Sequence, residues 1–144
     1  MIRIGAGIIA EIESSAVAAK PNEVCGFLVG AATATGTEVT RLVPSPNIAP
    51  EPETRFEIDP AIYFGLRRRL SESGETIVGI YHSHPAGPPE PSSEDLAAAN
   101  EPDWIWLICG HSEDNRLETR AFQMCISVAG GPANDFRPLD MVVV

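Results

Sequence analysis

Positive charge is scarce in this chain of 144 residues, which carries 10 Lys and Arg against 20 Asp and Glu for a net charge of −10. Its one basic cluster, Arg67-Arg68-Arg69, falls in a predicted helix and is typical of a solvated face. Because binding to phosphate backbones requires clustered positive charge, nucleic acid is not an expected partner. An acidic surface instead favours a neutral or basic protein substrate.

Long hydrophobic runs are also missing. No apolar stretch approaches the roughly 20 residues that span a bilayer, and residues 1–7 have neither the basic segment nor the long apolar run of a signal peptide. We therefore expect a cytoplasmic protein without a membrane partner. The length fits one domain, and 44% hydrophobic with 21% charged residues is ordinary for a soluble globular chain.

Cysteine is rare, with three residues that each lie in an apolar, strand-like run: Cys25, Cys109 and Cys125. None forms a Cys-x-x-Cys pair, so the sequence indicates buried free thiols and no thiolate zinc site. A zinc deaminase would need His-x-Glu together with Pro-Cys-x-x-Cys, and neither string occurs.

A pair of histidines, His82 and His84, stands at the end of the apolar run 76–81. That run predicts a buried strand, on which residues i and i+2 share a face. Asp95 follows eleven residues after His84, next to Ser92-Ser93, which is typical of a helix start. Two imidazoles and a carboxylate form a zinc ligand set that leaves a fourth position open. Calcium and magnesium prefer all-oxygen sites, whereas iron or manganese would also accept these ligands.

Helical and alternating apolar patterns succeed one another along the chain. We expect helices over residues 8–20, 61–72 and 93–100, and strands over 24–30, 38–43, 55–58, 77–81, 104–109 and 117–126. Several prolines make residues 44–54 a loop. The segment after residue 127 is either an added edge strand or a mobile arm. This order predicts an α+β fold, with a curved, largely antiparallel or mixed sheet flanked by helices.

The pattern His-x-His-Pro, a Gly/Pro-rich loop and then Pro-Ser-x-x-Asp resembles the signature of the JAMM (MPN-plus) zinc metalloprotease family in a minimal, prokaryotic form. Three further segments match that family: 22–30 around Glu23, 55–60 and 120–122. The resemblance covers about residues 3–126. It implies a cytidine-deaminase-like layered fold, the MPN (JAB) fold, with a metalloprotease domain over residues 1–128 and a C-terminal tail over 129–144.

The resemblance also implies roles for five residues. His82, His84 and Asp95 would bind Zn²⁺, Glu23 would act as general base, and Ser92 would donate a hydrogen bond to the oxyanion. From the residues alone, a solvated charge is the favoured interpretation of Glu23, and helix capping would fully explain the position of Ser92. If Ser92 serves the oxyanion, Ser93 is left as the cap. The loop from Gly87 to Pro91 is a candidate lid.

The expected function is that of a zinc-dependent metallopeptidase. The resemblance implies hydrolysis of a peptide or isopeptide bond after the C-terminal glycines of a ubiquitin-like or sulfur-carrier protein. The alternative is a non-catalytic MPN scaffold that keeps the fold and serves only in protein assemblies. A scaffold needs none of the five residues, so their presence favours the enzyme. The oligomeric state is left open, a homo-oligomer included.

Overall fold

The computed structural model describes residues 1–125 and 135–144 as a sheet with three helices. The helices of this part are α1 (Ala6–Ala19), α2 (Pro60–Leu70) and α3 (Ser93–Ala98). The strands are β1 (Ile2–Ile4), β2 (Cys25–Thr33), β3 (Gly36–Ser45), β4 (Thr76–Ser83), β5 (Ile105–His111), β6 (Leu117–Cys125), β7 (Asp135–Leu139) and β8 (Met141–Val143). None of these helices is long and apolar enough to cross a membrane.

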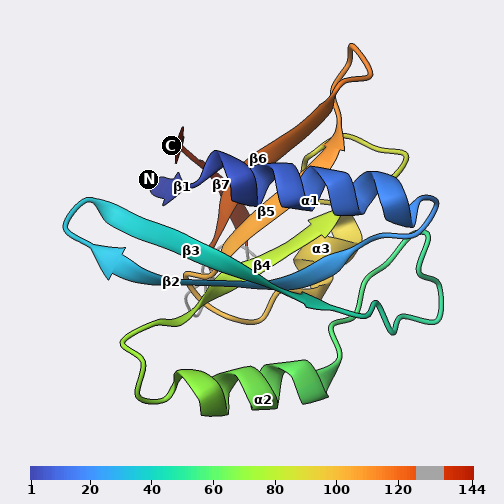
Figure 1. Cartoon of the computed structure of the whole chain (residues 1–144). Helices are drawn as coiled ribbons and strands as arrows, with labels where there is room; N and C mark the ends of the chain where they lie inside the picture. Colours follow the sequence, from blue (N-terminus) through green and yellow to red (C-terminus); the bar gives the residue numbers. More distant parts are fainter. Residues whose placement is uncertain (126–134) are drawn as a thin grey trace, which may run out of the picture.

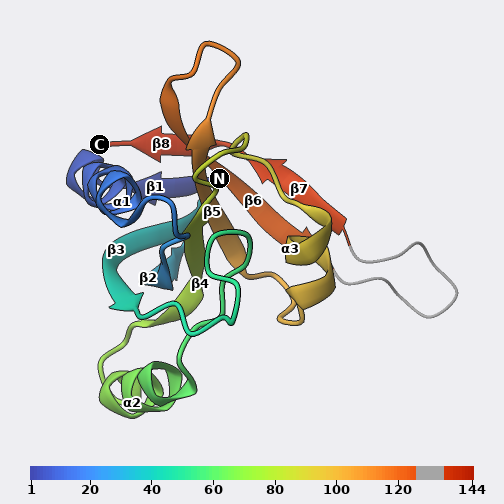
Figure 2. The ribbon, with the colours of Figure 1, turned by 90° about the vertical axis from the view of Figure 1, so that its right-hand side faces the viewer.

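The eight strands of the described residues form one mixed sheet in the order β7-β6-β5-β4-β2-β3-β1-β8. β4 runs parallel to β5, and β1 runs parallel to both β3 and β8, whereas the other neighbours are antiparallel. β7 and β8 lie at opposite ends of this order, yet Asp140 alone separates them along the chain. The sheet must therefore curve until its two ends approach each other, as Figure 2 shows. The predicted α+β class with a curved mixed sheet is confirmed.

Helices cover both faces of the sheet, with α1 on one side and α2 on the other (Figure 1). Side chains alternate between the two cores because successive residues of a strand point to opposite faces. On β5, Leu107 packs in the core under α1, and Trp106 packs in the core under α2. On β4, Tyr81 likewise faces the α1 core and Ile80 the α2 core. The residue after Tyr81, His82, therefore emerges on the α2 side.

The predicted elements differ from the structure mainly at their ends. β4 continues two residues past the expected strand and so includes His82 and Ser83. The predicted strand over 55–58 is wrong, because only an isolated bridge between Ile58 and Asn47 forms there in the described chain. The side chain of Asn47 bonds this backbone instead: Oδ1 accepts from the N–H of Glu57, and Nδ2 donates to the carbonyl of Arg55.

The segment after β6 contributes two strands at the two ends of the sheet, so the expectation of added edge strands describes residues 135–143 better than that of a mobile arm. The predicted boundary between residues 128 and 129 lies outside the described residues.

Candidate metal centre

The end of β4 delivers both histidines to one place. β4 lies between β2 and β5, with His82 opposite Cys25 on one side and Ile108 on the other. The chain leaves the strand after Ser83, and the N–H of His84 then donates to the carbonyl of Cys109 at 2.7 Å. His82 is fully buried, whereas the side chain of His84 is 11% exposed. The imidazole of His82 therefore lies beneath the surface, and that of His84 reaches the surface.

Asp95 is fixed by the first turn of α3. Ser92 is the N-cap, and its hydroxyl accepts from the N–H of Asp95 at 3.1 Å. The Asp95 carboxylate accepts in return from the N–H of Ser92 at 2.9 Å, which completes a capping box. The cap is thus Ser92 and not Ser93, whose hydroxyl donates to Glu94. The Ser92 oxygen accepts within the cap, so its own proton is free to donate elsewhere.

Two imidazoles and a carboxylate meet between β4 and α3. The Nε2 atoms of His82 and His84 are 3.0 Å apart. Nε2 of His82 lies 3.1 Å from Oδ1 of Asp95, and Nε2 of His84 lies 3.1 Å from its Oδ2. Tetrahedral zinc with bonds of 2.0–2.1 Å separates its ligand atoms by about 3.3 Å. The observed separations of 3.0 and 3.1 Å are close to this value, so the two imidazoles and the carboxylate fit a shared ion after small movements.

Each imidazole is oriented by a different device. Nδ1 of His84 bonds the carbonyl of Pro88 at 2.8 Å, which directs Nε2 toward Asp95, as is usual for metal-binding histidines. His82 is held by packing instead: Phe56 stacks on its ring and Trp106 meets it edge-on at 5.5 Å. Nδ1 of His82 is buried and has no hydrogen-bond partner among the described residues.

The loop that follows His84 is anchored to β5. The carbonyl of Gly87 accepts from the N–H of His111 at 2.8 Å, and Pro89 is fully buried. Gly110 permits this approach, because a Cβ there would lie 2.6 Å from the backbone of Pro88. These contacts fix the carbonyl that orients His84. They make the loop a support for the centre, and its role as a lid stays a prediction.

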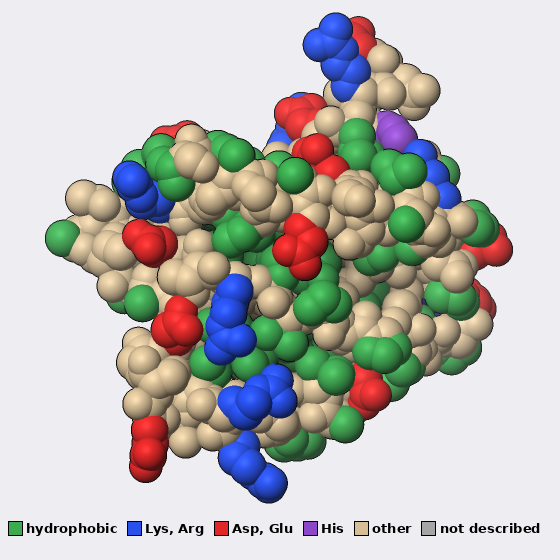
Figure 3. Space-filling view, viewed as in Figure 1, with side chains coloured by type: hydrophobic (Ala, Val, Ile, Leu, Met, Phe, Trp, Pro, Cys, Tyr) green, Lys and Arg blue, Asp and Glu red, His purple; other side chains and the backbone are tan. Residues whose placement is uncertain are grey.

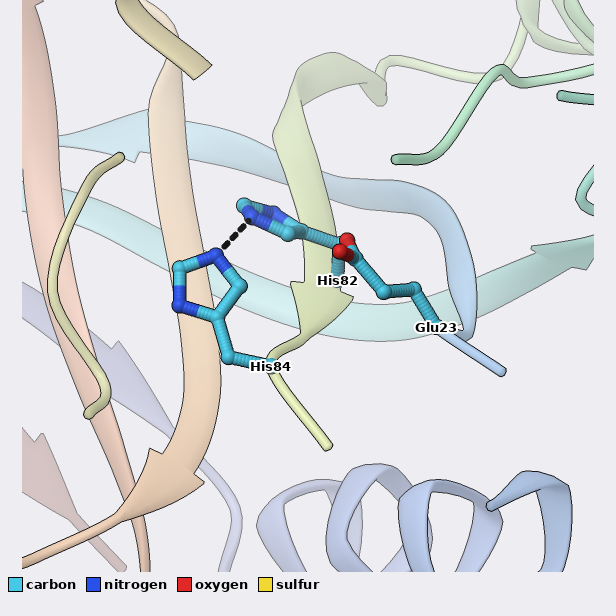
Figure 4. Close-up of side chains that lie close together, drawn as sticks. All are labelled: Glu23, His82 and His84. Carbon is cyan, nitrogen blue, oxygen red and sulfur yellow. Dashed lines mark hydrogen bonds between the residues drawn. The ribbon is translucent and has the colours of Figure 1, made fainter. Parts of the chain in front are cut away.

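Glu23 lies just before β2 and points toward the two histidines (Figure 4). One ligand atom from each of Glu23, His82 and His84 lies within 4.8 Å of the others. Its neighbour Val24 is tied to β4, since the Val24 N–H donates to Oγ of Ser83 at 2.9 Å. Behind it, Nδ2 of Asn47 donates to the carbonyl of Glu23 at 3.0 Å. Glu23 is 6% exposed, so it is not the solvated charge that its polarity alone would suggest.

Burial and mutual contact set the charges of this cluster. Complete burial lowers the pKa of His82 and favours the neutral, metal-binding imidazole. Burial opposes ionisation of Asp95 as well, but hydrogen bonds from His82 and His84 hold the pKa of its carboxyl well below the usual range. Burial raises the pKa of Glu23 to about 7; Asp95 and Glu94 add to this and His84 opposes it. A carboxyl with a pKa near neutrality is suited to exchanging protons.

The structure brings together Glu23, His82, His84 and Asp95, and it places Ser92 at the start of the helix that carries Asp95. Sequence reasoning missed the residues that hold this group in place. These are Asn47, Phe56, Gly110 and the carbonyl of Pro88. The match of segment 55–60 to a known family was a signal for Phe56. Nothing local marked Asn47, which lies in a Pro-rich loop.

Comparison with known families gives one match that covers most of the chain. The sequence model of the family described as prokaryotic homologs of the JAB domain matches residues 5–125. Two curated proteins are similar over much of their length. The desampylase of Haloferax volcanii is 36% identical over 110 residues, which are 76% of each chain. The CysO-cysteine peptidase of Mycobacterium tuberculosis is 31% identical over 104 residues, 72% of this chain and 69% of the relative.

A solved structure is similar over the whole chain. The solution structure of a protein from Desulfitobacterium hafniense superimposes with a TM-score of 0.82 at 27% identity, and the match covers 100% of this chain and 93% of the other. The likeness therefore includes the end strands β7 and β8 as well as the region around the histidines.

Proposed function

We propose that this chain, which belongs to the family of prokaryotic homologs of the JAB domain, is a zinc-dependent metallopeptidase. Its reaction would be hydrolysis of a peptide or isopeptide bond after the C-terminal glycines of a ubiquitin-like or sulfur-carrier protein. The family resemblance seen in the sequence is thereby confirmed, and the finer assignments of metal, residues and substrate form the proposal.

One observation carries the proposal: two imidazole nitrogens and a carboxylate converge within 3.1 Å of one another, beside a second buried carboxylate. His82, His84 and Asp95 would hold the metal. Bound Zn²⁺ would supply Lewis acidity, which polarises a carbonyl and lowers the pKa of water to about 7. Buried ionisable groups are costly unless they are paired or hold a metal, and here His82, His84 and Asp95 contact one another at the place where a metal would sit.

Glu23 and Ser92 would carry the proton and the developing charge. The Glu23 carboxylate would take a proton from the attacking water and deliver it to the leaving amine, a role for which its raised pKa is suited. The Ser92 hydroxyl would donate to the oxyanion of the tetrahedral intermediate. Removing one such donor typically costs about 10² to 10³ in rate.

The names of the relatives support the substrate class. One relative is called a desampylase and another a CysO-cysteine peptidase, and a third, from Thermus thermophilus, is called a probable protease that cleaves TtuB-protein conjugates. One of these names describes cleavage of a protein conjugate, and another describes a peptidase that acts on CysO-cysteine. We propose for this chain the shared element, a bond that follows the tail of a small carrier protein.

The experiment uses a ubiquitin-like sulfur-carrier protein extended by one residue after Gly-Gly, with cleavage followed by intact mass. The zinc-loaded wild-type protein should release the extra residue, and EDTA should stop the reaction until zinc is restored. The matched variant is Glu23→Gln, which keeps the shape and removes the base. It should bind one zinc per chain and turn over at least about a thousandfold more slowly, the upper part of the range for general base catalysis.

Two results would count against the proposal. Wild-type rates in Glu23→Gln would remove Glu23 from the reaction. No cleavage by a fully zinc-loaded wild-type protein, with this carrier and with an isopeptide conjugate of it, would favour the scaffold alternative.

A further inference from the structure

The outer edge of β6 is covered over only part of its length. β7 pairs with β6 from Ala121 to Cys125, and within the described residues no strand pairs with the earlier part of β6, residues 117–120, on that side. This earlier part belongs to the hairpin between β5 and β6, which projects from the body of the molecule (Figure 3). Its backbone N–H and C=O groups form an open edge, and such an edge is a template for an added strand.

A groove lies beside this open edge. Its volume is about 640 Å³, which is in the usual range for binding sites. β6 forms one wall and the junction of β7 and β8 forms the other, with apolar lining from Ala121, Leu139 and Met141. β8 pairs with β1 and with no other strand in the described part of the chain. The groove therefore lies where the curved sheet stays open between its two ends.

The groove opens on the face of the sheet that carries the metal centre. His82 lies opposite Ile108 in β5, and Ile108 lies opposite Arg120 in β6. Directly opposite residues of neighbouring strands point to the same face, so Arg120 shares a face with His82. Because adjacent strands are 4.7–4.9 Å apart, two such steps place the backbone of Arg120 about 10 Å from that of the histidine.

The loop that follows His84 also links the groove to the centre. The guanidinium of Arg120 donates to the carboxylate of Glu90 in this loop at 3.3 Å. Glu90 and Pro91 both line the groove, and Pro91 is followed directly by Ser92, the N-cap of α3. A chain segment that lies in the groove would thus begin beside the proposed oxyanion donor.

The groove has an acidic border. Three of its lining residues, Glu90, Glu118 and Asp140, carry carboxylates, and Arg120 carries the single positive charge of the lining. Arg120 is already paired with two of them, Glu118 at 3.0 Å and Glu90 at 3.3 Å. The side chains of Glu90 and Glu118 are 58% and 40% exposed, so their field reaches the solvent. The net charge of the border therefore attracts a basic side chain.

We propose that this groove binds the segment of the substrate that leaves with the amine, as an extended strand that pairs with residues 117–120 of β6 and presents Lys or Arg to the acidic border. The inference rests on the proposed function. The glycines before the cut have no side chain or charge to match the border, so the occupant is the chain beyond the cut. In a peptide substrate this chain is the residues after Gly-Gly, and in an isopeptide substrate it is the chain around the modified lysine.

The first test measures binding without turnover. An eight-residue peptide with Lys at alternate positions is titrated into the zinc-loaded, ¹⁵N-labelled protein. The amide signals of residues 117–121 should shift, and their hydrogen exchange should slow as backbone pairs form. A peptide with Glu in place of each Lys should bind about tenfold more weakly, because like charges would meet at the border.

Reversing the border should reverse this preference. Glu118→Lys/Asp140→Lys should raise the Kd of the Lys peptide at least about tenfold and lower that of the Glu peptide. The matched control is Glu11→Lys/Glu72→Lys, which makes the same change in net charge at exposed positions on α1 and after α2. The control should keep the order and size of the wild-type affinities.

Strand pairing is tested on the wild-type protein with two further Lys peptides. One is N-methylated at its odd positions and the other at its even positions. Successive residues of a strand direct their N–H groups to opposite edges, so one of the two peptides should lose at least about tenfold in affinity and the other should retain it. Binding of both with the affinity of the unmethylated peptide would rule out strand addition.

A cleavage assay connects the groove with the reaction. A ubiquitin-like sulfur-carrier protein is extended after Gly-Gly by the Lys peptide or by the Glu peptide. In the wild type, kcat/KM should be about tenfold higher for the Lys extension, and in Glu118→Lys/Asp140→Lys this ratio should invert. Because each ratio is taken within one protein, a general change in its catalytic rate cancels.

The outcomes distinguish the groove from the chemistry. Titration without shifts at residues 117–121 would overturn the proposal, and so would a cleavage ratio near one in a protein that binds the Lys peptide. If the border reversal altered only a concentration-dependent dimer in sedimentation, the open edge would serve a second copy of this chain. Peptide binding at residues 117–121 with no cleavage of any extended carrier would overturn the proposed function, while the peptide site would stand.

Discussion

Phe56 stacks on the imidazole of His82, with ring centroids 4.3 Å apart and an angle of 20° between the planes. His82 lacks a hydrogen bond at Nδ1 within the described chain, so this aromatic contact and that of Trp106 set the direction of Nε2. Most metal-binding histidines are oriented by a hydrogen bond at the second nitrogen, as His84 is here through Pro88. The two neighbouring histidines are thus oriented in two different ways, one by ring packing and the other by a hydrogen bond.

Replacing Phe56 by leucine should weaken metal binding. The substitution keeps an apolar side chain but removes the flat surface that fixes the ring of His82. Loss of an outer contact of a ligand typically costs about 10- to 100-fold in metal affinity, and we expect the lower end. Zinc affinity is measured by competition with a chromophoric chelator.

The control for Phe56→Leu is Phe122→Leu, which thins the same core but has no ring contact with His82. It should lower the unfolding midpoint without changing the zinc affinity. Equal affinity losses in both variants would show that general loosening of the core, and not ring orientation, is responsible.

Asp95→Ala should abolish stable metal binding, because only two of the three proposed ligands, His82 and His84, would then remain. Elemental analysis of the purified protein should find about one zinc per chain in the wild type and a small fraction of that in the variant. Glu94→Ala is the control on the same turn of α3 and should retain the metal. Full occupancy in Asp95→Ala would refute the assignment of this ligand.

Ser92 combines two roles that substitutions can separate. Ser92→Ala removes the N-cap of α3, which costs about 1 kcal/mol, and also the hydroxyl. Glycine is nearly as good a cap as serine, so Ser92→Gly should restore most of the stability but none of the hydroxyl chemistry. Both variants should therefore be slower by about 10² to 10³ in kcat. If both kcat and the unfolding midpoint recovered in Ser92→Gly relative to Ser92→Ala, capping would be the whole role of Ser92.

The metal-free protein should lose stability as the pH rises through neutrality, because of Glu23. Burial raises the pKa of Glu23 from 4.5 to about 7, so between these values the folded state binds a proton that the unfolded state releases. The stabilisation is complete below 4.5 and is lost as the pH passes 7, by up to about 3 kcal/mol. Glu23→Gln cannot titrate and removes this dependence.

The comparison needs urea denaturation of both proteins at pH 5 and pH 8 in the presence of a chelator. The other titrating groups of the cluster are common to both, so the difference between the two pH dependences reports Glu23. Parallel curves would mean that Glu23 keeps an ordinary pKa in the folded protein.

The sequence predicted the parts of the centre that depend on local pattern. The strand period of two predicted that His82 and His84 lie on one side, and the two do meet, although β4 ends at Ser83. A serine before an acidic first turn marks the helix that carries Asp95. Glu23 was placed only through the family resemblance. Its neighbour Val24 contacts Ser83, which lies 59 residues further along the chain, so no local pattern links Glu23 to the histidines.

The supporting contacts could not be predicted from pattern. The run 55–58 has the alternating composition of a strand, yet the Asn47 side chain takes the hydrogen bonds that a neighbouring strand would have provided. Phe56 then turns toward His82 instead of joining a ladder. Such tertiary competition overrides local propensity and is visible only once the chain is folded.

The short link at Asp140 makes the pairing of two distant strands depend on one segment. Open sheet edges recruit strands from other molecules, and here a single ten-residue segment, residues 135–144, shields the flank of β6 and the flank of β1 together. Loss of that segment would expose the edges of β6 and β1 at the same time. The resulting molecule would have two strand edges with unpaired backbone groups, which could pair with other molecules into end-to-end polymers.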